Sequence, residues 1–586
     1  MRCLPVLSAA LLLASTVEAQ APANVIVFLA DDLGYADVGP FDHDLDPLTP
    51  EVTNTPVLDQ LAAEGVRLTS FYANSPVCSP TRAALLTGRH SIRSDITHVF
   101  KSGDPKGLPA AEVTLAEMLE PLGYRSGIVG KWHLGEPLEF LPLQQGFDEF
   151  YGVPFSNNAA GLYLLRGNTV VSTSVDQTQL TQDFTREAEL FIDSAASAGD
   201  PFFLYVAYTA PHVPLFVSPA FRGVTARGLY ADCVYELDDS IGRILARLDL
   251  HGLADDTLVV FTSDNGACNN SVVGPDPGAP GAGDPERWAC GSNLPYAGFK
   301  FGFLEGGLRV PCIARWPGVL PAGVDRDTVA SVLDLLPTVA AITGATPPLD
   351  RPLDGEDLFG VLTVDAPRAL DELHFYALYQ GAQWGTRTLA CTRGGAWKQF
   401  YSQQFAPQAL FNLELDPGET TSTFGPPGGT LWDRSRDFDC TLDEGLAFPS
   451  PVNLASLRTT HVSSSTGCET SSRAVDSDPS TQWHSAAGSS QSLALDLGSA
   501  QPLQRVILEW GADPATQYEL QTSSDGVAWQ TVFGEDGGNG GRDIVAVAVT
   551  TRYLQVECLA GPGVGFGLRE LRIQAAKLPD VPSALK

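Results

Sequence analysis

From residue 24 onward, the chain alternates between short apolar runs and amphipathic stretches of helical period, and this alternation most constrains its fold. The first run, Val25–Ala30, is apolar throughout and has the length of a strand, which suits a parallel sheet covered on both faces. Thr55–Pro56 opens a helix that Gly65 ends, and Thr114 with Glu117 forms the capping box of another. We therefore predict a parallel α/β domain. Further strands are predicted at Tyr124–Val129, Phe202–Tyr208 and Thr257–Thr262, and a helix at Tyr235–Leu248.

Charged and imidazole side chains directly follow four of these strands. They are Asp31 and Asp32 after the first strand, Lys131 and His133 after the second, His212 after the third, and Asp264 and Asn265 after the fourth. Open α/β sheets bind ligands at the carboxyl ends of their strands. The four strand ends therefore predict one metal-containing catalytic site.

Two polar pairs are the candidate metal ligands. Asp31-Asp32 and Asp264-Asn265 supply up to four hard oxygen ligands, which suit Ca²⁺ or Mg²⁺ rather than zinc. Either pair alone could instead cap a helix or occupy a solvated turn. Adjacent carboxylates repel each other, and a divalent cation at the strand ends would relieve that repulsion, so the two pairs together favour a metal.

The most specific motif is Cys78–Arg82, with the sequence Cys-Ser-Pro-Thr-Arg, followed by Leu86–Arg89. Cys-x-Pro-x-Arg is the minimal signal for oxidation of a cysteine to Cα-formylglycine. On this pentapeptide alone, Cys78 could equally be a small buried core residue.

Five further segments belong with this motif. They are Gly130–Gly135, Pro154–Ser156, Pro211–Pro214, Glu305–Pro311 with the preceding Lys300, and Leu410–Glu419. Taken singly, their lysines and histidines could be exposed surface or turn residues. Together the segments resemble the type I, formylglycine-dependent sulfatases, the arylsulfatase family of the alkaline phosphatase superfamily, across roughly residues 24–420. Thr81 is the one departure, because Ser is commoner there, but Cys, Pro and Arg remain.

The resemblance implies a fold and a chemistry. The fold is a large mixed, mostly parallel sheet between helices, with a small antiparallel C-terminal subdomain. Cys78 would become formylglycine through the oxygen-using formylglycine-generating enzyme, and the aldehyde hydrate would attack sulfur with one hydroxyl and expel sulfate with the other. The implied roles are Ca²⁺ binding by Asp31, Asp32, modified Cys78, Asp264 and Asn265, positioning of the hydrate by Arg82 and Lys131, and substrate binding by Lys131, Ser156, His212 and Lys300. His212 would protonate the leaving oxygen, and His133 would assist the elimination that restores the aldehyde.

Charge and the N-terminus limit the partners and the compartment. Lys and Arg total 36 against 69 Asp and Glu, a net charge of −33, which repels polyanions and argues against nucleic acid. A sulfated polymer would need a local basic pocket or screening salt. No stretch has about 18 uninterrupted apolar residues, which predicts no membrane span. Arg2, the apolar run Leu11–Ala14 and the small-x-small site Val17–Ala19 predict a signal peptide at residues 1–19, hence an exported protein, periplasmic or extracellular.

The cysteines are expected to form disulfides in an exported protein. Cys268 and Cys290 flank a Pro/Gly-rich insertion and are the first predicted bridge, and Cys468 and Cys558 are the next candidates. No close CxxC pair exists, so metal binding by these cysteines is not expected.

Composition changes near residues 439–452, where Pro449–Pro451 has the character of a linker. Short alternating strands follow at Ser492–Leu497, Val506–Trp510 and Tyr518–Gln521, joined by Gly-rich turns, which predicts an all-β sandwich. Segments Ala474–Trp483, Asp496–Gly498, Ser524–Trp529 and Leu568–Leu571 resemble a discoidin (coagulation factor 5/8 C-type) domain. The resemblance implies carbohydrate binding and a second, structural Ca²⁺ near Asp476, Asp478, Thr481 and Glu570. Trp483 and Trp529 are predicted in the core, and Phe566 is a candidate for stacking on sugar.

These observations predict a domain order and a function. The domains are a signal peptide at 1–19, a sulfatase domain at 20–440 with its C-terminal subdomain at 345–440, a linker at 441–452 and a discoidin-like sandwich at 453–577. The predicted activity is hydrolysis of sulfate esters, with a sulfated carbohydrate as the expected substrate. The alternatives are a phosphonate or phosphate monoester hydrolase on the same fold, and a non-catalytic carbohydrate-binding protein, which the filled catalytic positions disfavour.

Overall fold

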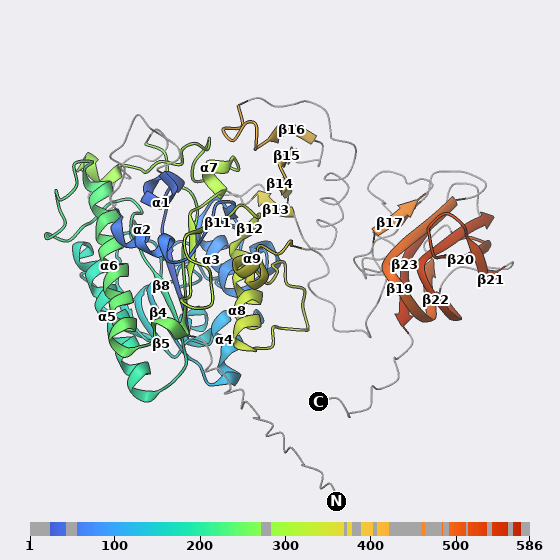
Figure 1. Cartoon of the computed structure of the whole chain (residues 1–586), viewed down its shortest axis with the longest axis horizontal. Helices are drawn as coiled ribbons and strands as arrows, with labels where there is room; N and C mark the ends of the chain where they lie inside the picture. The colour runs from blue at the N-terminus through green and yellow to red at the C-terminus, as the bar shows by residue number, and fades with distance from the viewer. Residues whose placement is uncertain are drawn as a thin grey trace, which may run out of the picture.

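The protein is described by a computed structural model (Figure 1). It describes residues 24–42, 55–270, 283–368, 372–377, 388–401, 407–420, 459–462, 483–484, 491–510, 514–535, 542–560 and 567–575. The predicted signal peptide, the predicted linker, and Asp476, Asp478, Thr481 and Phe566 lie outside these residues. Within them, no helix is both long enough and apolar enough to cross a membrane.

The first part of the chain is built on a ten-stranded sheet in the order β11-β2-β10-β9-β1-β8-β4-β5-β6-β7. Its central strands are β9 (Thr257–Ser263), β1 (Asn24–Ala30), β8 (Phe202–Ala207), β4 (Arg125–Lys131) and β5 (Glu149–Val153), and each runs parallel to its neighbour. The flanking strands are β2 (Val66–Leu68), β10 (Cys312–Arg315), β11 (Val324–Arg326), β6 (Leu164–Arg166) and β7 (Thr169–Ser172). Because β10, β6 and β7 pair antiparallel, the sheet is mixed but mostly parallel, and the predicted fold class is confirmed.

Helices cover both faces of this sheet (Figure 1). The helices are α1 (Gly39–Asp42), α2 (Pro56–Ala63), α3 (Cys78–Thr87), α4 (Leu115–Leu119), α5 (Leu180–Ala198), α6 (Leu229–His251), α7 (Glu305–Leu308), α8 (Leu335–Thr343) and α9 (Phe359–Val364). Val27 of β1 belongs to the core that contains Leu336 of α8. Phe28, the next residue, belongs to the core that contains Phe184 of α5 and Leu237 of α6. The apolar run of β1 is therefore continuous because both of its faces are buried.

Helix α6 is longer than the sequence predicts. It begins at Leu229, whereas the pattern predicts a start at Tyr235. Asp232 in its first turn is buried, and its carboxylate accepts hydrogen bonds from the Gly223 N–H at 2.6 Å and the Thr225 N–H at 2.8 Å. These local bonds hold an additional stretch of helix that the apolar period alone does not reveal.

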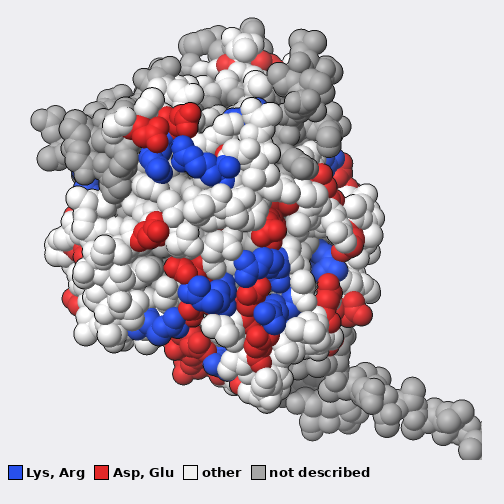
Figure 2. Space-filling view, turned by 90° about the vertical axis from the view of Figure 1, so that its left-hand side faces the viewer, with Lys and Arg blue, Asp and Glu red and all other residues white. Residues whose placement is uncertain are grey.

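Ion pairs join the two long helices on their exposed sides. Arg243 of α6 pairs with Glu189 of α5 at 3.0 Å, and Arg247 pairs with Asp193 at 3.5 Å. Figure 2 shows one face of the molecule, on which basic and acidic side chains lie intermingled. Basic and acidic side chains on this face therefore neutralise one another locally, as is usual for a solvent-exposed surface.

Two small sheets accompany the large one in the first part of the chain. Strands β3 (Phe71–Tyr72) and β12 (Ala330–Ser331) pair parallel. Strands β13 (Glu372–Ala377), β14 (Thr388–Gly394), β15 (Trp397–Tyr401) and β16 (Pro407–Asn412) form an antiparallel sheet, as predicted for the C-terminal subdomain.

Every element among the described residues of the last part of the chain, from Thr459 to Ala575, is a β-strand, as predicted. The strands are β17 (Thr459–Val462), β18 (Trp483–His484), β19 (Gln491–Trp510), β20 (Gln517–Ser523), β21 (Gln530–Glu535), β22 (Arg542–Ala560) and β23 (Gly567–Ala575), all paired antiparallel around their own apolar core. Two predicted strands are one long strand, β19, whose register shifts between Asp496 and Gln501. Trp483 lies in β18, Glu570 lies in β23, and Trp529 is half-buried just before β21.

The predicted bridge between Cys468 and Cys558 is wrong. Cys558 is a free, fully buried thiol on β22, and Cys468 lies outside the described residues. The Cys558 side chain packs with Leu520 and Val556 in the apolar core, where a cysteine serves as a small hydrophobic residue.

Candidate active site

The predicted strand-end residues do meet at one edge of the large sheet. Asp31 and Asp32 follow β1, Asp264 and Asn265 follow β9, and all four are buried. Backbone bonds hold the two turns together, since the Asp264 N–H donates to the Ala30 carbonyl at 3.1 Å. The Asp32 backbone has a φ of +63°, in the left-handed region that Asp tolerates better than most residues.

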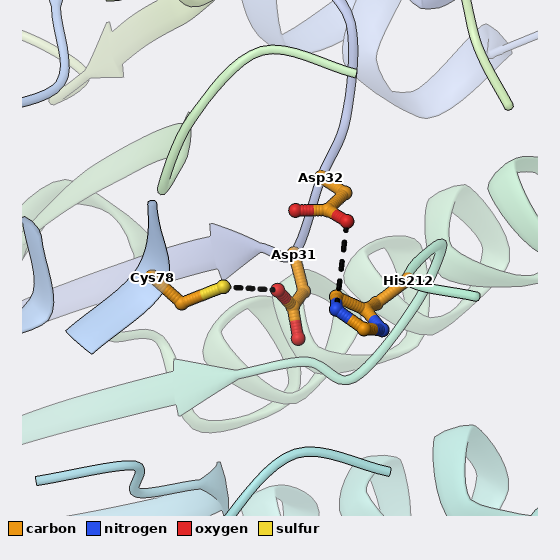
Figure 3. Close-up of side chains that lie close together, drawn as sticks. All are labelled: Asp31, Asp32, Cys78 and His212. Atoms are coloured by element: carbon orange, nitrogen blue, oxygen red, sulfur yellow. Dashed lines mark hydrogen bonds and ion pairs between the residues drawn. The ribbon is translucent and has the colours of Figure 1, made fainter. Parts of the chain in front are cut away.

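Four side chains point toward one another at the centre of this edge (Figure 3). Asp31, Asp32, Cys78 and His212 each place one ligand atom within 4.8 Å of the others. The Cys78 sulfur lies 3.5 Å from Asp31 Oδ1, and His212 Nε2 lies 3.6 Å from Asp32 Oδ2. Such a group of side chains is able to hold a metal ion.

Asp264 and Asn265 border this cluster. Asp264 Oδ1 accepts the Asp32 N–H at 3.2 Å, while Asn265 Nδ2 donates to Asp32 Oδ1 at 2.7 Å. Asn265 Oδ1 is buried and has no hydrogen-bond partner among the described residues. Burial, with a further contribution from Asp31, raises the pKa of Asp264 to about 6.

Three cations face the three carboxylates. Lys131 Nζ lies 2.5 Å from Asp31 Oδ2, and Lys300 Nζ lies 2.9 Å from Asp32 Oδ2 and 3.6 Å from the Cys78 sulfur. Arg82 donates to Asp264 Oδ2 from Nε at 3.0 Å and from Nη2 at 2.8 Å. The charges of the cluster therefore balance in its buried environment.

Ser156 and the two predicted catalytic histidines lie at the same site. Ser156 Oγ is 3.4 Å from Lys131 Nζ. His133 Nε2 bonds the Phe100 carbonyl at 2.8 Å, and its Nδ1 has no partner among the described residues. Burial, reinforced by Lys131, holds the pKa of His133 well below its ordinary value. Burial, reinforced by Lys300, lowers the pKa of His212 to about 4, so both rings are neutral at pH 7 here.

The hydroxyl of Thr81 fixes the turn that leads into α3. Thr81 Oγ1 accepts the Ser75 N–H at 3.1 Å and donates to the Ser75 carbonyl at 3.0 Å. A serine hydroxyl has the same donor and acceptor. Threonine in place of the commoner serine therefore preserves both of these hydrogen bonds.

Sequence reasoning missed two residues that support the site. Asn293 accepts the Ala267 N–H at 2.8 Å and donates to the Ala267 carbonyl at 3.1 Å and the Gly298 carbonyl at 3.2 Å, so it joins the Asn265 turn to the Lys300 segment. Asp37 accepts from the Tyr230 hydroxyl at 2.6 Å and from the Ser292 N–H at 2.9 Å, so it fixes the residue that precedes Asn293. Isolated polar residues outside strand ends and motifs gave no signal in the sequence.

The predicted bridge between Cys268 and Cys290 is confirmed. Cys268 comes three residues after Asn265, and Cys290 comes three residues before Asn293. The disulfide therefore closes the insertion that separates these two parts of the site.

Comparison with known families decides the assignment. A family model described as Sulfatase matches residues 23–345, more than half of the chain. The chain belongs to the sulfatase family. A second model, the F5/8 type C domain, matches residues 458–571 of this sulfatase, so both predicted resemblances are confirmed.

Individual relatives agree with this family. The sulfatase is similar to the N-acetylgalactosamine-6-sulfatase of Homo sapiens, with 38% identity over 458 residues that cover 73% of this chain and 81% of the relative. It is 35% identical to arylsulfatase A of Bos taurus over 456 residues, 70% of this chain and 85% of the relative. The enzyme class predicted from the sequence, a sulfuric ester hydrolase, is thereby confirmed.

Solved structures show the same fold. The PsFucS1 sulfatase from Pseudoalteromonas sp. matches with a TM-score of 0.62 and 26% identity, covering 73% of this chain and 92% of that one. The structure named Ps i-CgsB matches with a TM-score of 0.58 and 30% identity, covering 69% and 88%.

Proposed function

We propose that this sulfatase hydrolyses a sulfate ester of a carbohydrate, R–O–SO₃⁻, to the alcohol and sulfate, with formylglycine at position 78 and a bound Ca²⁺. We further propose that it is exported and acts in the periplasm or outside the cell. The observation that supports this best is the convergence of Cys78, Lys131 and Lys300 on one oxygen-rich cluster at the strand ends.

The donor set fits a hard cation. Asp31, Asp32 and Asp264 supply carboxylate oxygens. Asn265 Oδ1, which has no hydrogen-bond partner among the described residues, supplies a neutral oxygen that is able to bind a cation. The Cys78 sulfur stands where the modified residue would present hydroxyl oxygens, which Ca²⁺ prefers to sulfur. These five residues would hold Ca²⁺. When bound, Ca²⁺ and the aldehyde hydrate would supply an activated oxygen nucleophile and positive charge for the sulfate.

Charge balance supports an anionic substrate. The whole chain carries −33, but the three site cations compensate the three site carboxylates. A divalent cation added to a neutral cluster leaves it net positive. The site would then attract a sulfate ester despite the acidity of the chain as a whole.

The side chains of the site have distinct proposed tasks. Lys300 and Lys131 bind the sulfate oxygens, with Ser156 beside Lys131 as a hydrogen-bond donor. Arg82 and Lys131 fix residue 78. An anionic sulfate beside His212 favours the protonated ring, which then donates its proton to the leaving oxygen. His133, whose Nδ1 is free of other described partners, accepts the proton released when the aldehyde is restored.

Comparison supports a glycan as the substrate. The N-acetylgalactosamine-6-sulfatases carry a sugar in their names, and Ps i-CgsB has been solved with k-i-k-neocarrahexaose. The F5/8 type C domain would add a second contact with the sugar chain, with a structural Ca²⁺ near Glu570 and the undescribed Asp476, Asp478 and Thr481. The bounds 20–440 for the sulfatase domain and 453–577 for the C-terminal domain remain our proposal.

The direct test uses protein coproduced with a formylglycine-generating enzyme. Mass spectrometry should show formylglycine at position 78, and the protein should cleave members of a panel of sulfated mono- and oligosaccharides. Cys78→Ala should abolish turnover and keep the fold, whereas Cys312→Ala, which changes another buried free cysteine, should stay active. Full activity with unmodified Cys78 would refute the nucleophile. Faster turnover of aryl phosphates than of every sulfate ester would favour a phosphate ester hydrolase.

The C-terminal domain is tested separately. Truncation after Val452 should preserve turnover of p-nitrophenyl sulfate, because every proposed catalytic residue precedes it. The same truncation should lower activity on a polymeric sulfated glycan, where a second contact raises the effective concentration. Unchanged polymer activity, with no glycan binding by the isolated domain, would contradict the targeting role.

A further inference from the structure

An aromatic side chain stands exposed beside the most buried part of the site. Phe301 directly follows Lys300 and is 45% exposed, whereas Lys300 itself is only 5% exposed. The Lys300 Nζ atom lies 5.4 Å from the centroid of the Phe301 ring and 3.6 Å from the Cys78 sulfur. The ammonium group of Lys300 therefore contacts both the Phe301 ring and the sulfur of the proposed nucleophile.

The backbone of Phe301 is held in an unfavourable conformation. Its φ is +76°, in the left-handed region that favours glycine and that a bulky side chain rarely adopts. Six described non-glycine residues have a positive φ, and Phe301 is the one with an apolar side chain. Two of the others, Asp32 and His133, belong to the proposed site. Backbone strain of this kind persists where surrounding structure enforces it, often at functional sites.

Neighbouring segments enforce this conformation. The Lys300 N–H donates to the Ala267 carbonyl at 3.0 Å, and the Phe301 N–H donates to the Pro76 carbonyl at 2.9 Å. Pro76 precedes Cys78 by two residues, and Ala267 follows Asn265 by two. The Phe301 backbone is thus fixed to the two segments that carry the proposed nucleophile and a metal ligand.

The exposed part of the Phe301 ring does not compensate for the strain of its backbone. Full burial of an apolar ring in the core would offset the strain, but Phe301 is almost half exposed. Part of the ring contacts Lys300 Nζ, and the part that stays exposed is available to an occupant of the site. A sulfate held at Lys300 places the group to which it is esterified next to the Phe301 ring.

We propose that Phe301 stacks against the apolar face of the sugar ring that bears the scissile sulfate, and so sets specificity for pyranose substrates. The inference rests on the proposed function. The C–H groups on one face of a pyranose carry partial positive charge, and the face of an aromatic ring is negative, so the two attract without a formal charge. A contact between neutral groups does not depend on the net charge of the chain, which is −33.

The test separates the ring from the backbone strain. Phe301→Gly removes the ring and also relieves the positive φ, so its melting temperature should not fall below that of wild type. Its KM for N-acetylgalactosamine 6-sulfate, or for whichever other sulfated pyranose of the panel the enzyme cleaves, should rise about tenfold while kcat changes less than about twofold. Phe301→Trp should restore KM to within about twofold of wild type. Leu250→Ala, which removes a 68% exposed apolar side chain at the end of α6, is the control and should change nothing.

Inhibition by inorganic sulfate completes the test, because this ion probes the Lys300 pocket without a sugar. Its Ki should be the same in Phe301→Gly and in wild type. A Ki that rises together with KM would show that Phe301 only positions Lys300, and would overturn the stacking proposal. An unchanged KM in an enzyme that cleaves sulfated sugars would also overturn it and leave the sulfatase assignment intact. An enzyme with formylglycine at position 78 that cleaves no sulfate ester would overturn both.

Discussion

Substitution of Lys398 by methionine is expected to destabilise the first part of the chain severely. Lys398 lies on β15, and its Nζ is 2.9 Å from Glu305 Oε1 and 3.1 Å from Glu419 Oε1. The side chains of all three residues are fully buried. Glu305 also opens α7, five residues after Lys300, so this ion pair connects the antiparallel sheet to the proposed catalytic segment.

The expected loss follows from the burial. Lys398→Met keeps most of the side-chain volume but removes the cation that lies between two buried carboxylates, and among the described residues Glu305 keeps only the longer ion pair with Arg309 at 3.4 Å. Removing one partner of a buried ion pair costs about 3–5 kcal/mol. Lys106→Met is the matched control, because Lys106 pairs with Asp95 at 3.1 Å with both side chains about two-thirds exposed, and such pairs contribute at most about 1 kcal/mol.

The pH dependence provides an independent check. Burial alone would raise the pKa of Glu305, but Lys398, together with Arg309 and Arg393, outweighs it and lowers that pKa to about 2. In wild type, the ionised Glu305 therefore contributes stability at pH values above about 4.5, and this contribution is lost as the pH falls toward 2. Loss of Lys398 removes the strongest of the cations that lower the pKa of Glu305, so this pKa should rise in the variant. The variant should therefore be weakest relative to wild type at neutral pH and approach wild type as the pH falls.

Urea unfolding of both variants and wild type, followed by tryptophan fluorescence between pH 8 and pH 4, measures this difference. We expect the Lys398→Met midpoint to fall well below that of Lys106→Met at pH 8, and the gap to narrow on acidification. A loss no larger than that of Lys106→Met, or a gap independent of pH, would refute the assignment of this buried pair.

Three further predictions concern the site and its disulfide. His212→Ala should lower kcat/KM for sugar sulfates by about 10²–10⁴-fold and far less for p-nitrophenyl sulfate, whose leaving group needs no proton; equal losses would reject His212 as the general acid. Asp264→Asn should weaken Ca²⁺ binding in calorimetry, and activity that survives exhaustive chelation would contradict the metal. Replacing Cys268 and Cys290 with serine should cost about 3 kcal/mol of unfolding free energy, since the bridge closes a separation of 22 residues; an unchanged urea midpoint would contradict this.

The strands and their ends could be predicted well because they follow local rules. Val25–Ala30 is apolar throughout, and it forms most of β1 (Asn24–Ala30). The capping box of Thr114 and Glu117 opens α4 as predicted. Polar residues directly after parallel strands meet at one edge of a sheet, so the members of the candidate site could be named from their positions along the chain.

What the sequence did not reveal depends on long-range contacts. Lys398 and Glu305 are 93 residues apart, and neither pattern nor motif connects them. Asn293 supports the site through backbone bonds to Ala267 that no side-chain pattern encodes. Phe301 stands out only through its φ and its exposure, which are properties of the folded chain. Cys558 was paired wrongly because cysteine in an apolar strand looks the same in sequence whether it is bridged or free.

The burial of α3 has a consequence for the timing of synthesis. All ten residues from Cys78 to Thr87 are buried, and Cys78 is only 1% exposed. An oxidising enzyme that acts on this thiol needs to bind the surrounding peptide, and the folded protein does not offer it. The proposed conversion must therefore take place on the nascent or unfolded chain. A molecule that folds first would keep an unmodified thiol at Cys78. The yield of active protein in any host therefore depends on the rate of oxidation relative to the rate of folding.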